Sequence, residues 1–146
     1  MSFARPYSYI SDSSLAELWR SRPKDVKVVD VRDDDFEGGN LVGALHVPST
    51  RFNDEVQGLV TGPLRDARQV IFHCSLSQSR GPKAARIYRE TRDEAIATGK
   101  IKPLGSGQQD EQQVQVLRDG FAGFGPKYKN DASLVEKWDE ESWKYR

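Results

Sequence analysis

One short segment of the chain carries a thiol and a guanidinium at a spacing suited to chemistry on an anion. Cys74 and Arg80 are separated by five residues in the run HCSLSQSRGP. A thiolate is a strong nucleophile, and a planar guanidinium can hold two oxygens of a tetrahedral oxyanion at once. We therefore expect a nucleophile and an anion-binding group to act together in this segment.

The residues between Cys74 and Arg80 form the expected binding loop. Backbone N–H groups that follow a strand and open a helix can converge on one oxyanion, and the helix dipole adds to their attraction. The same donors would stabilise a thiolate on Cys74, so one loop supplies both the nucleophile and its anion site. The predicted oxyanion-binding residues are Ser75, Leu76, Ser77, Gln78 and Ser79.

The flanking elements must place this loop at the edge of a sheet. Gln69 to Phe72 predicts a short strand directly before the loop, and a helical pattern runs from Lys83 to about Ala97 after it. In an open α/β sheet, ligands bind at the carboxyl ends of the strands. The loop therefore lies where such a sheet carries its chemistry.

The rest of the chain alternates short strands and helices, which predicts an α/β fold with a mostly parallel central sheet flanked by helices on both faces. Leu134, Val135, Trp138 and Trp143 are spaced as in a closing amphipathic helix. The glycine-rich and proline-containing stretch 98–110 predicts a flexible loop, with a substrate lid as the alternative. Further expected elements are an extended start at 9–10, a helix capped by Ser11 or Ser13, a strand at 26–31, an extended run at 41–47, a helix at 52–59, a strand at 113–117 and a turn at 119–120.

Length and composition narrow the class of protein. A chain of 146 residues suits one domain, and its formal net charge of zero gives no global field that would favour nucleic acid or an anionic membrane. A lone cysteine permits no internal disulfide, and with only two histidines we predict neither a metal site nor a cofactor. The start of the chain lacks the apolar core of a secretory signal, so we expect a cytoplasmic location, with the nucleus also open.

The loop sequence, together with the upstream run VVDVRDDDFEGGNLVGALHVP and the downstream run VQVLRDGF, resembles the rhodanese-fold proteins. Among them it is similar to the M-phase inducer (cell-division-cycle) phosphatases and to the arsenate reductases of fungi and plants. The resemblance implies a single rhodanese-like domain over 1–146, with a core at about 9–125 and a C-terminal helical extension at 126–146. Sulfurtransferase rhodaneses typically have a loop one residue shorter, so the seven residues from Cys74 to Arg80 favour phosphate or arsenate over thiosulfate.

The resemblance implies a cysteine-dependent phosphatase of the protein tyrosine or dual-specificity type, with Cys74 and Arg80 as its catalytic residues and a phosphorylated protein or a small oxyanion as its substrate. The alternative is arsenate reduction, for which the second thiol must come from outside, from glutathione or a glutaredoxin, because the chain has no second cysteine. Sulfur transfer from thiosulfate and a non-catalytic binding module are the remaining possibilities.

Several residues near the loop have a structural and a catalytic interpretation. The resembling phosphatases carry Glu in the loop where this chain has Ser75 and Ser79, so an acid for the leaving group would come from elsewhere. We expect Asp30 to brace the loops together with Arg32, and His73 to have a structural hydrogen-bonding role rather than to act as a base. The acidic loop could supply the missing acid or simply be solvated; its residues are Asp33, Asp34, Asp35 and Glu37. We expect His46 to be half-buried in a strand.

Overall fold

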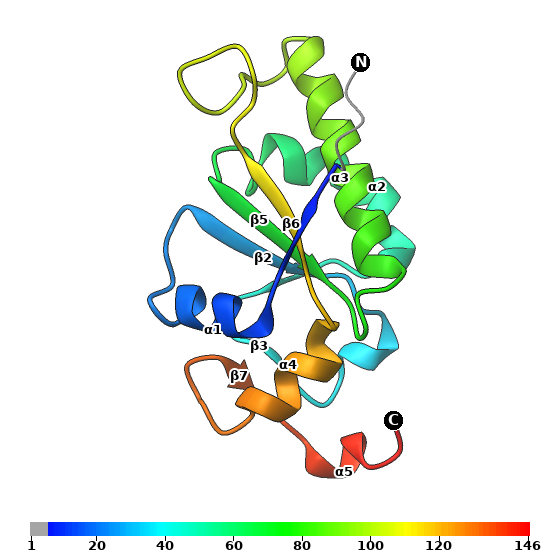
Figure 1. Cartoon of the computed structure of the whole chain (residues 1–146). Helices are drawn as coiled ribbons and strands as arrows, with labels where there is room; N and C mark the ends of the chain where they lie inside the picture. Colours follow the sequence, from blue (N-terminus) through cyan, green and yellow to red (C-terminus); the bar gives the residue numbers. More distant parts are fainter. Residues whose placement is uncertain (1–5) are drawn as a thin grey trace.

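The computed structural model describes residues 6–146 and contains a five-stranded sheet in which every strand pairing is parallel (Figure 1). The spatial order of the strands is β1-β6-β5-β2-β4. Parallel pairing brings the carboxyl ends of the strands to one edge of the sheet. The strands are β1 (Ser8–Ile10), β2 (Val26–Asp30), β4 (Leu45–His46), β5 (Gln69–His73) and β6 (Gln113–Leu117).

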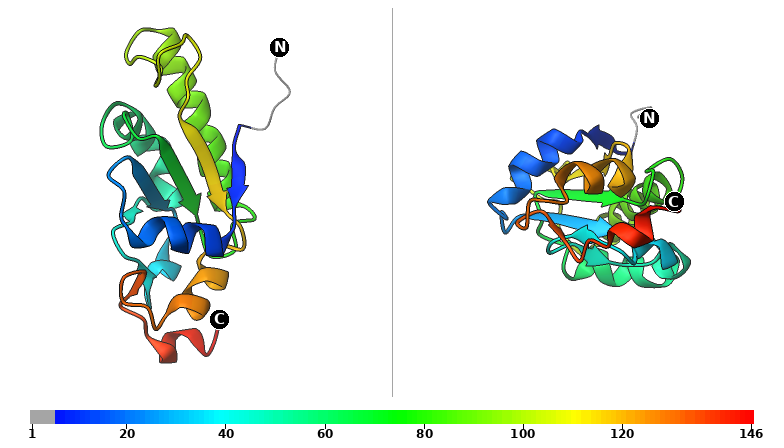
Figure 2. Two further views of the ribbon diagram at one scale, coloured as in Figure 1. Left: turned by 60° about the vertical axis from the view of Figure 1, so that its left-hand side comes forward. Right: turned by 90° about the horizontal axis from the view of Figure 1, so that it is seen from below.

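Helices cover both faces of this sheet, as Figure 2 shows. On one face, α2 (Phe52–Thr61) and α3 (Arg80–Ala97) pack against one apolar cluster, and on the other face α1 (Asp12–Arg20) and α4 (Gly120–Tyr128) pack against a second. The predicted α/β class with helices on both faces is confirmed. Within residues 6–146, no helix is both long enough and apolar enough to cross a membrane.

The position of β5 at the centre of the sheet explains why its apolar residues do not alternate with polar ones. All five of its residues are buried, because Val70 and Phe72 face the α2 and α3 side while Ile71 faces the α1 and α4 side. A strand covered on both faces carries apolar residues on both sides of the sheet, so its apolar residues follow one another without alternation. The same is true of β2, where Val28 and Val29 enter opposite clusters.

The predicted extended run at 41–47 is wrong as a single element. Its residues lie in two separate strands, β3 (Asn40–Leu41) and β4, with a turn between them in which Gly43 has a φ of +80°. Only glycine enters that region at little cost. The turn sends β4 to pair with β2 in the main sheet, whereas β3 pairs with a strand from the C-terminal part of the chain.

The predicted amphipathic helix through Leu134 and Trp143 is also wrong. The chain instead forms β7 (Val135–Glu136), antiparallel to β3, and then only the short α5 (Glu140–Trp143). Leu134 and Val135 are buried in the core, and the N–H of Val42 donates to the Leu134 carbonyl. The apolar residues whose spacing suits a helix therefore have other roles. Some take part in a strand pairing, and Trp138 and Trp143 stack on each other with ring centroids 4.8 Å apart.

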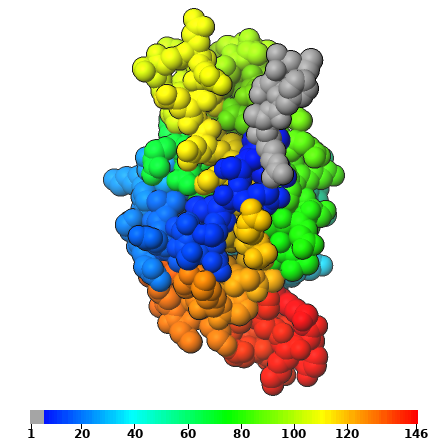
Figure 3. Space-filling model, viewed as in Figure 1, coloured from blue at the N-terminus to red at the C-terminus, as the bar shows by residue number. Residues whose placement is uncertain are grey.

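The 98–110 segment lies at the opposite end of the molecule from the Cys74 loop. Helix α3 starts at the Cys74 loop and is 18 residues long, about 27 Å, before the 98–110 segment begins. Figure 1 and Figure 3 show this segment at one end of the molecule and the C-terminal residues at the other. Asp110 anchors it through ion pairs with Arg89 and Arg92. The lid interpretation is therefore wrong, because the segment cannot reach Cys74.

Candidate active site

Three loops meet around Cys74 at the carboxyl edge of the sheet. Cys74 follows β5 directly, and the register pairs His73 with Asp30, the last residue of β2, so the loops after these two strands begin side by side. The third segment is the turn after β6, from which α4 starts. The predicted position of the loop, between a strand and the N-terminus of a helix, is confirmed.

The Cys74 thiol is buried and receives two backbone hydrogen bonds. It is 3% exposed, and its Sγ accepts from the N–H of Ser77 at 3.2 Å and from the N–H of Gly81 at 3.3 Å. Ser77 has a left-handed backbone, with a φ of 55°, which turns the loop back over the sulfur. Two N–H dipoles aimed at Sγ stabilise a negative charge on that atom, and the N-terminus of α3 contributes in the same direction.

The carbonyl groups of the loop are directed at α4. The N–H of Phe121 donates to the Cys74 carbonyl at 2.9 Å, and the N–H of Ala122 donates to the Ser75 carbonyl at 2.8 Å. Gly120 permits this approach, because a Cβ atom there would lie 2.4 Å from the Ser75 oxygen and 2.6 Å from the Cys74 oxygen. The first turn of α4 therefore fixes the orientation of the loop backbone at Cys74 and Ser75.

Arg80 contacts the acidic loop in this structure. Its Nη1 and Nη2 donate to the two carboxylate oxygens of Asp35 at 2.9 and 2.6 Å, and Nη1 also lies 3.2 Å from Oδ2 of Asp33. The hydrogen bonds that Arg80 donates hold the pKa of Asp35 well below its usual value despite partial burial, and the same bonds to the Asp35 carboxylate raise the pKa of Arg80. Both groups are therefore charged at neutral pH.

These contacts show whether the acidic residues could supply an acid for the leaving group or are simply solvated. Asp33 and Asp35 do reach the loop, but as ion-pair partners of Arg80 rather than as carboxyl groups holding a proton. Asp34 and Glu37 are exposed. The sequence did not predict the pairing with Arg80, because Asp35 and Arg80 are 45 residues apart and no sequence pattern links the two segments.

The expected brace between Asp30 and Arg32 is confirmed. Both side chains are fully buried, and the Nε and Nη2 atoms of Arg32 donate to both carboxylate oxygens of Asp30 at 2.7 to 3.1 Å. Arg32 also donates to the carbonyl oxygens of Asp35 and Gly39. The buried pair therefore fixes the backbone that presents the Asp35 side chain to Arg80.

The two histidines lie outside the segment from Cys74 to Arg80. His73 is fully buried, its Nδ1 lies 3.2 Å from the Cys74 carbonyl, and burial lowers its pKa despite the attraction of Asp30. The expected hydrogen-bonding role of His73 is confirmed by the contact of its Nδ1. His46 is exposed rather than half-buried as expected, because its ring stacks at 3.8 Å on Phe36 at the surface instead of entering the core.

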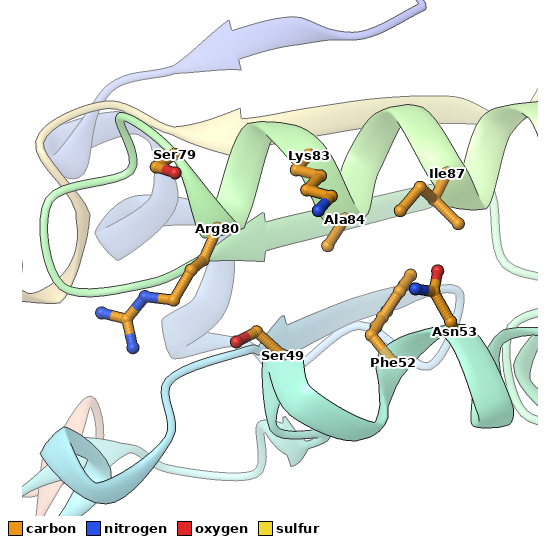
Figure 4. Close-up of a pocket in the computed structure, with 8 residues that line it drawn as sticks. All are labelled: Ser49, Phe52, Asn53, Ser79, Arg80, Lys83, Ala84 and Ile87. Atoms are coloured by element: carbon orange, nitrogen blue, oxygen red, sulfur yellow. The ribbon is translucent and has the colours of Figure 1, made fainter.

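A groove of about 160 Å³ opens beside Arg80, between α2 and the start of α3 (Figure 4). Phe52, Ala84 and Ile87 give it an apolar wall, and Lys83 adds a positive charge. Figure 4 shows the Arg80 side chain extending away from Lys83 and Ile87, in the direction of its contacts with the acidic loop. The remaining lining residues are Ser49, Asn53 and Ser79.

Comparisons with known proteins find relatives that match most of this chain. The chain is 34% identical over 134 residues to the dual specificity phosphatase ibp1 of Schizosaccharomyces pombe, covering 88% of this chain and 96% of the relative. It is 35% identical to the dual specificity phosphatase Cdc25 of Arabidopsis thaliana, covering 85% and 77%, and 30% identical to arsenate reductase 2.2 of Oryza sativa, covering 83% and 84%.

Among solved structures, the chain resembles Saccharomyces cerevisiae Ygr203w, described as a homolog of single-domain rhodanese and of the Cdc25 phosphatase catalytic domain. The TM-score is 0.74 at 26% identity, over 97% of this chain and 95% of that one. Residues 14–127 match the rhodanese-like domain as a family. With a parallel sheet of this order, a cysteine loop at its carboxyl edge and these relatives, the chain belongs to the rhodanese-like domain family.

Proposed function

We propose that this chain is a cysteine-dependent phosphatase that acts on a phosphorylated protein or an aryl phosphate through a phosphocysteine intermediate. The observation that carries the proposal is the Cys74 sulfur, which accepts two backbone N–H bonds in a loop that ends at Arg80. Relatives named dual specificity phosphatases, which match most of this chain, support the proposed phosphatase activity.

In the proposed reaction, the Cys74 thiolate attacks phosphorus in line with the leaving oxygen. A sulfur–phosphorus bond forms as the phosphorus–oxygen bond breaks, and the leaving oxygen takes a proton from water. Arg80 and the amides of residues 75 to 79 hold the three other phosphoryl oxygens, where charge accumulates in the transition state. A water molecule then attacks phosphorus, which releases inorganic phosphate and returns the thiolate.

Arsenate reduction is the second candidate, favoured by the match to arsenate reductase 2.2. The thiolate would displace water from protonated arsenate to form a sulfur–arsenic bond. An external thiol of the glutathione or glutaredoxin kind would then attack the Cys74 sulfur, so that arsenic leaves as arsenite with two electrons and a mixed disulfide remains. A second external thiol would free Cys74, since the chain has no other cysteine.

One set of assays separates these activities. The purified protein and its Cys74→Ser variant are given an aryl phosphate, arsenate with glutathione and glutaredoxin, and thiosulfate with cyanide. We expect phosphate release that Cys74→Ser abolishes. Arsenite formation alone would select the second candidate, thiocyanate formation alone would show sulfur transfer, and no turnover on any substrate would leave a binding module and refute the phosphatase.

A further inference from the structure

We propose that Asp35 determines which anions this loop accepts: its carboxylate occupies Arg80 in the free protein, and a tetrahedral dianion must displace it to bind. This inference rests on the proposed function, since it assigns the oxyanion to the same loop. It concerns a residue outside the loop, contributed by the segment after β2.

The contacts of Asp35 are those that an oxyanion would need. Its two carboxylate oxygens take both terminal nitrogens of Arg80, at 2.9 and 2.6 Å, which is the bidentate geometry that guanidinium groups offer to phosphate. The Ser75 hydroxyl donates to the same carboxylate at 2.5 Å. Asp35 thus engages two groups of the loop at once, and the guanidinium cannot give the same pair of donors to a ligand until the carboxylate leaves.

The two acidic residues differ in the partners that hold them. Besides Arg80, the Asp33 carboxylate accepts from the Ser49 hydroxyl at 2.6 Å and from the N–H of Thr50 at 3.2 Å, which both lie outside the Cys74 loop. Besides Arg80, the Asp35 carboxylate accepts from the Ser75 hydroxyl and from the N–H of Asp33 at 2.9 Å, and its side chain is 30% exposed. An anion bound in the loop would compete for Arg80 and Ser75, which are partners of Asp35, so Asp35 is the carboxylate that such an anion displaces.

The backbone of Asp35 does not have to move for this exchange. Its carbonyl oxygen accepts from Arg32 at 3.2 Å and from Arg146 at 3.3 Å, so contacts other than those of the carboxylate hold the peptide. Arg32 is itself held by the buried Asp30. A backbone that is held without the carboxylate allows Asp35 to act as a reversible internal occupant of the anion site.

The charge of this occupant selects the ligand. A monoanion that replaces Asp35 on Arg80 gains about the attraction that it removes and meets about the same repulsion from Asp33. A dianion such as phosphate or arsenate doubles both the attraction and the repulsion. Because oxygens bonded to Arg80 lie closer to the guanidinium than to the Asp33 carboxylate, the added attraction exceeds the added repulsion. The site therefore favours tetrahedral dianions over monoanions. Removal of the Asp35 charge weakens this selection and tightens anion binding in general.

The test measures anion affinity without turnover. Cys74 is the single thiol of the chain, so its alkylation by iodoacetamide reports occupancy of the loop, and protection by inorganic phosphate gives a dissociation constant. We expect Asp35→Asn to bind phosphate about tenfold more tightly than the parent. The matched control is Asp34→Asn, which removes the same charge from an exposed neighbour that makes no side-chain ion pair within the described residues. We expect a change of less than about twofold there.

Either of two results would overturn the inference: Asp35→Asn binding phosphate no more tightly than the parent, or Asp34→Asn gaining as much as Asp35→Asn. Phosphate that protects neither the parent nor Asp35→Asn would overturn it too. Melting temperatures of both variants show whether the fold is retained, and Asp35→Glu, which keeps the charge, should bind phosphate as weakly as the parent. Turnover by the parent protein decides the proposed function separately, so the two failures are distinguishable.

Discussion

Gly120 gives the sharpest test of how the loop is held. A methyl group at this position would lie 2.4 Å from the Ser75 oxygen and 2.6 Å from the Cys74 oxygen, and the residue has a φ of +61°. The left-handed backbone costs an alanine about 1 to 2 kcal/mol. Displacing α4 would also weaken the two hydrogen bonds from Phe121 and Ala122, at about 1 kcal/mol each.

The sum predicts that Gly120→Ala lowers the free energy of unfolding by roughly 3 kcal/mol, or the melting temperature by about 10 °C. Because the loop loses its support, phosphate protection of Cys74 from iodoacetamide should weaken by about tenfold. The control is Gly58→Ala in α2, where a Cβ atom meets nothing within 4 Å. That change should stabilise the protein by about 0.5 to 1 kcal/mol, because alanine restricts the helix backbone.

Urea unfolding and the alkylation assay measure both effects on the same samples. A Gly120→Ala protein that unfolds within about 0.5 kcal/mol of the parent, with phosphate protection unchanged, would refute the idea that α4 orients the loop. A loss of stability with normal phosphate protection would restrict the role of Gly120 to the fold.

Three further predictions concern charged groups. Arg32→Leu should destabilise the protein by about 3 to 5 kcal/mol in urea unfolding, since it leaves the buried Asp30 carboxylate without its partner; a loss below about 1 kcal/mol would contradict this. Burial would raise the pKa of Asp110, yet hydrogen bonds from Arg92 hold it well below its usual value. Because the folded pKa is depressed, the stability that this carboxylate contributes is present above its unfolded pKa of about 3.9 and is lost as the pH falls from there toward the folded value. The difference in unfolding free energy between the parent and Asp110→Asn should therefore be constant from pH 7 to 5. It should shrink below pH 4. Arg80→Lys should weaken phosphate protection of Cys74 by about tenfold, because an ammonium cannot give two parallel donors; equal protection would show that charge alone suffices.

Much of the fold could be predicted from local sequence, because the signals involved are short. The apolar β5 run is buried on both faces and needs no alternation, and Ser11 caps α1 by accepting from the N–H of Ser14, one of the two caps expected. The place of Cys74 follows from the same logic, since a strand, a polar loop and a helix that are contiguous in sequence must also be contiguous in space.

The error at the C-terminal end of the chain involves a segment whose partner is distant in sequence. Leu134 and Val135 have apolar spacing that suits a helix, but β3 offers backbone donors and acceptors nearly a hundred residues away, and the pairing competes successfully with a short helix. The turn at 119–120 was expected, yet not the helix that starts there and supports the Cys74 loop.

The sequence by itself determined the chemistry of the loop: one thiol, one guanidinium and five residues between them, placed after an apolar strand. Only the tertiary structure decided what surrounds them. The pairing of Asp35 with Arg80 and the contact of α4 with the loop carbonyls depend on how three strands end at one edge of the sheet. Residue types fix which groups can bind an anion, but the distances that set their charge balance come from chain topology, which local propensity does not contain.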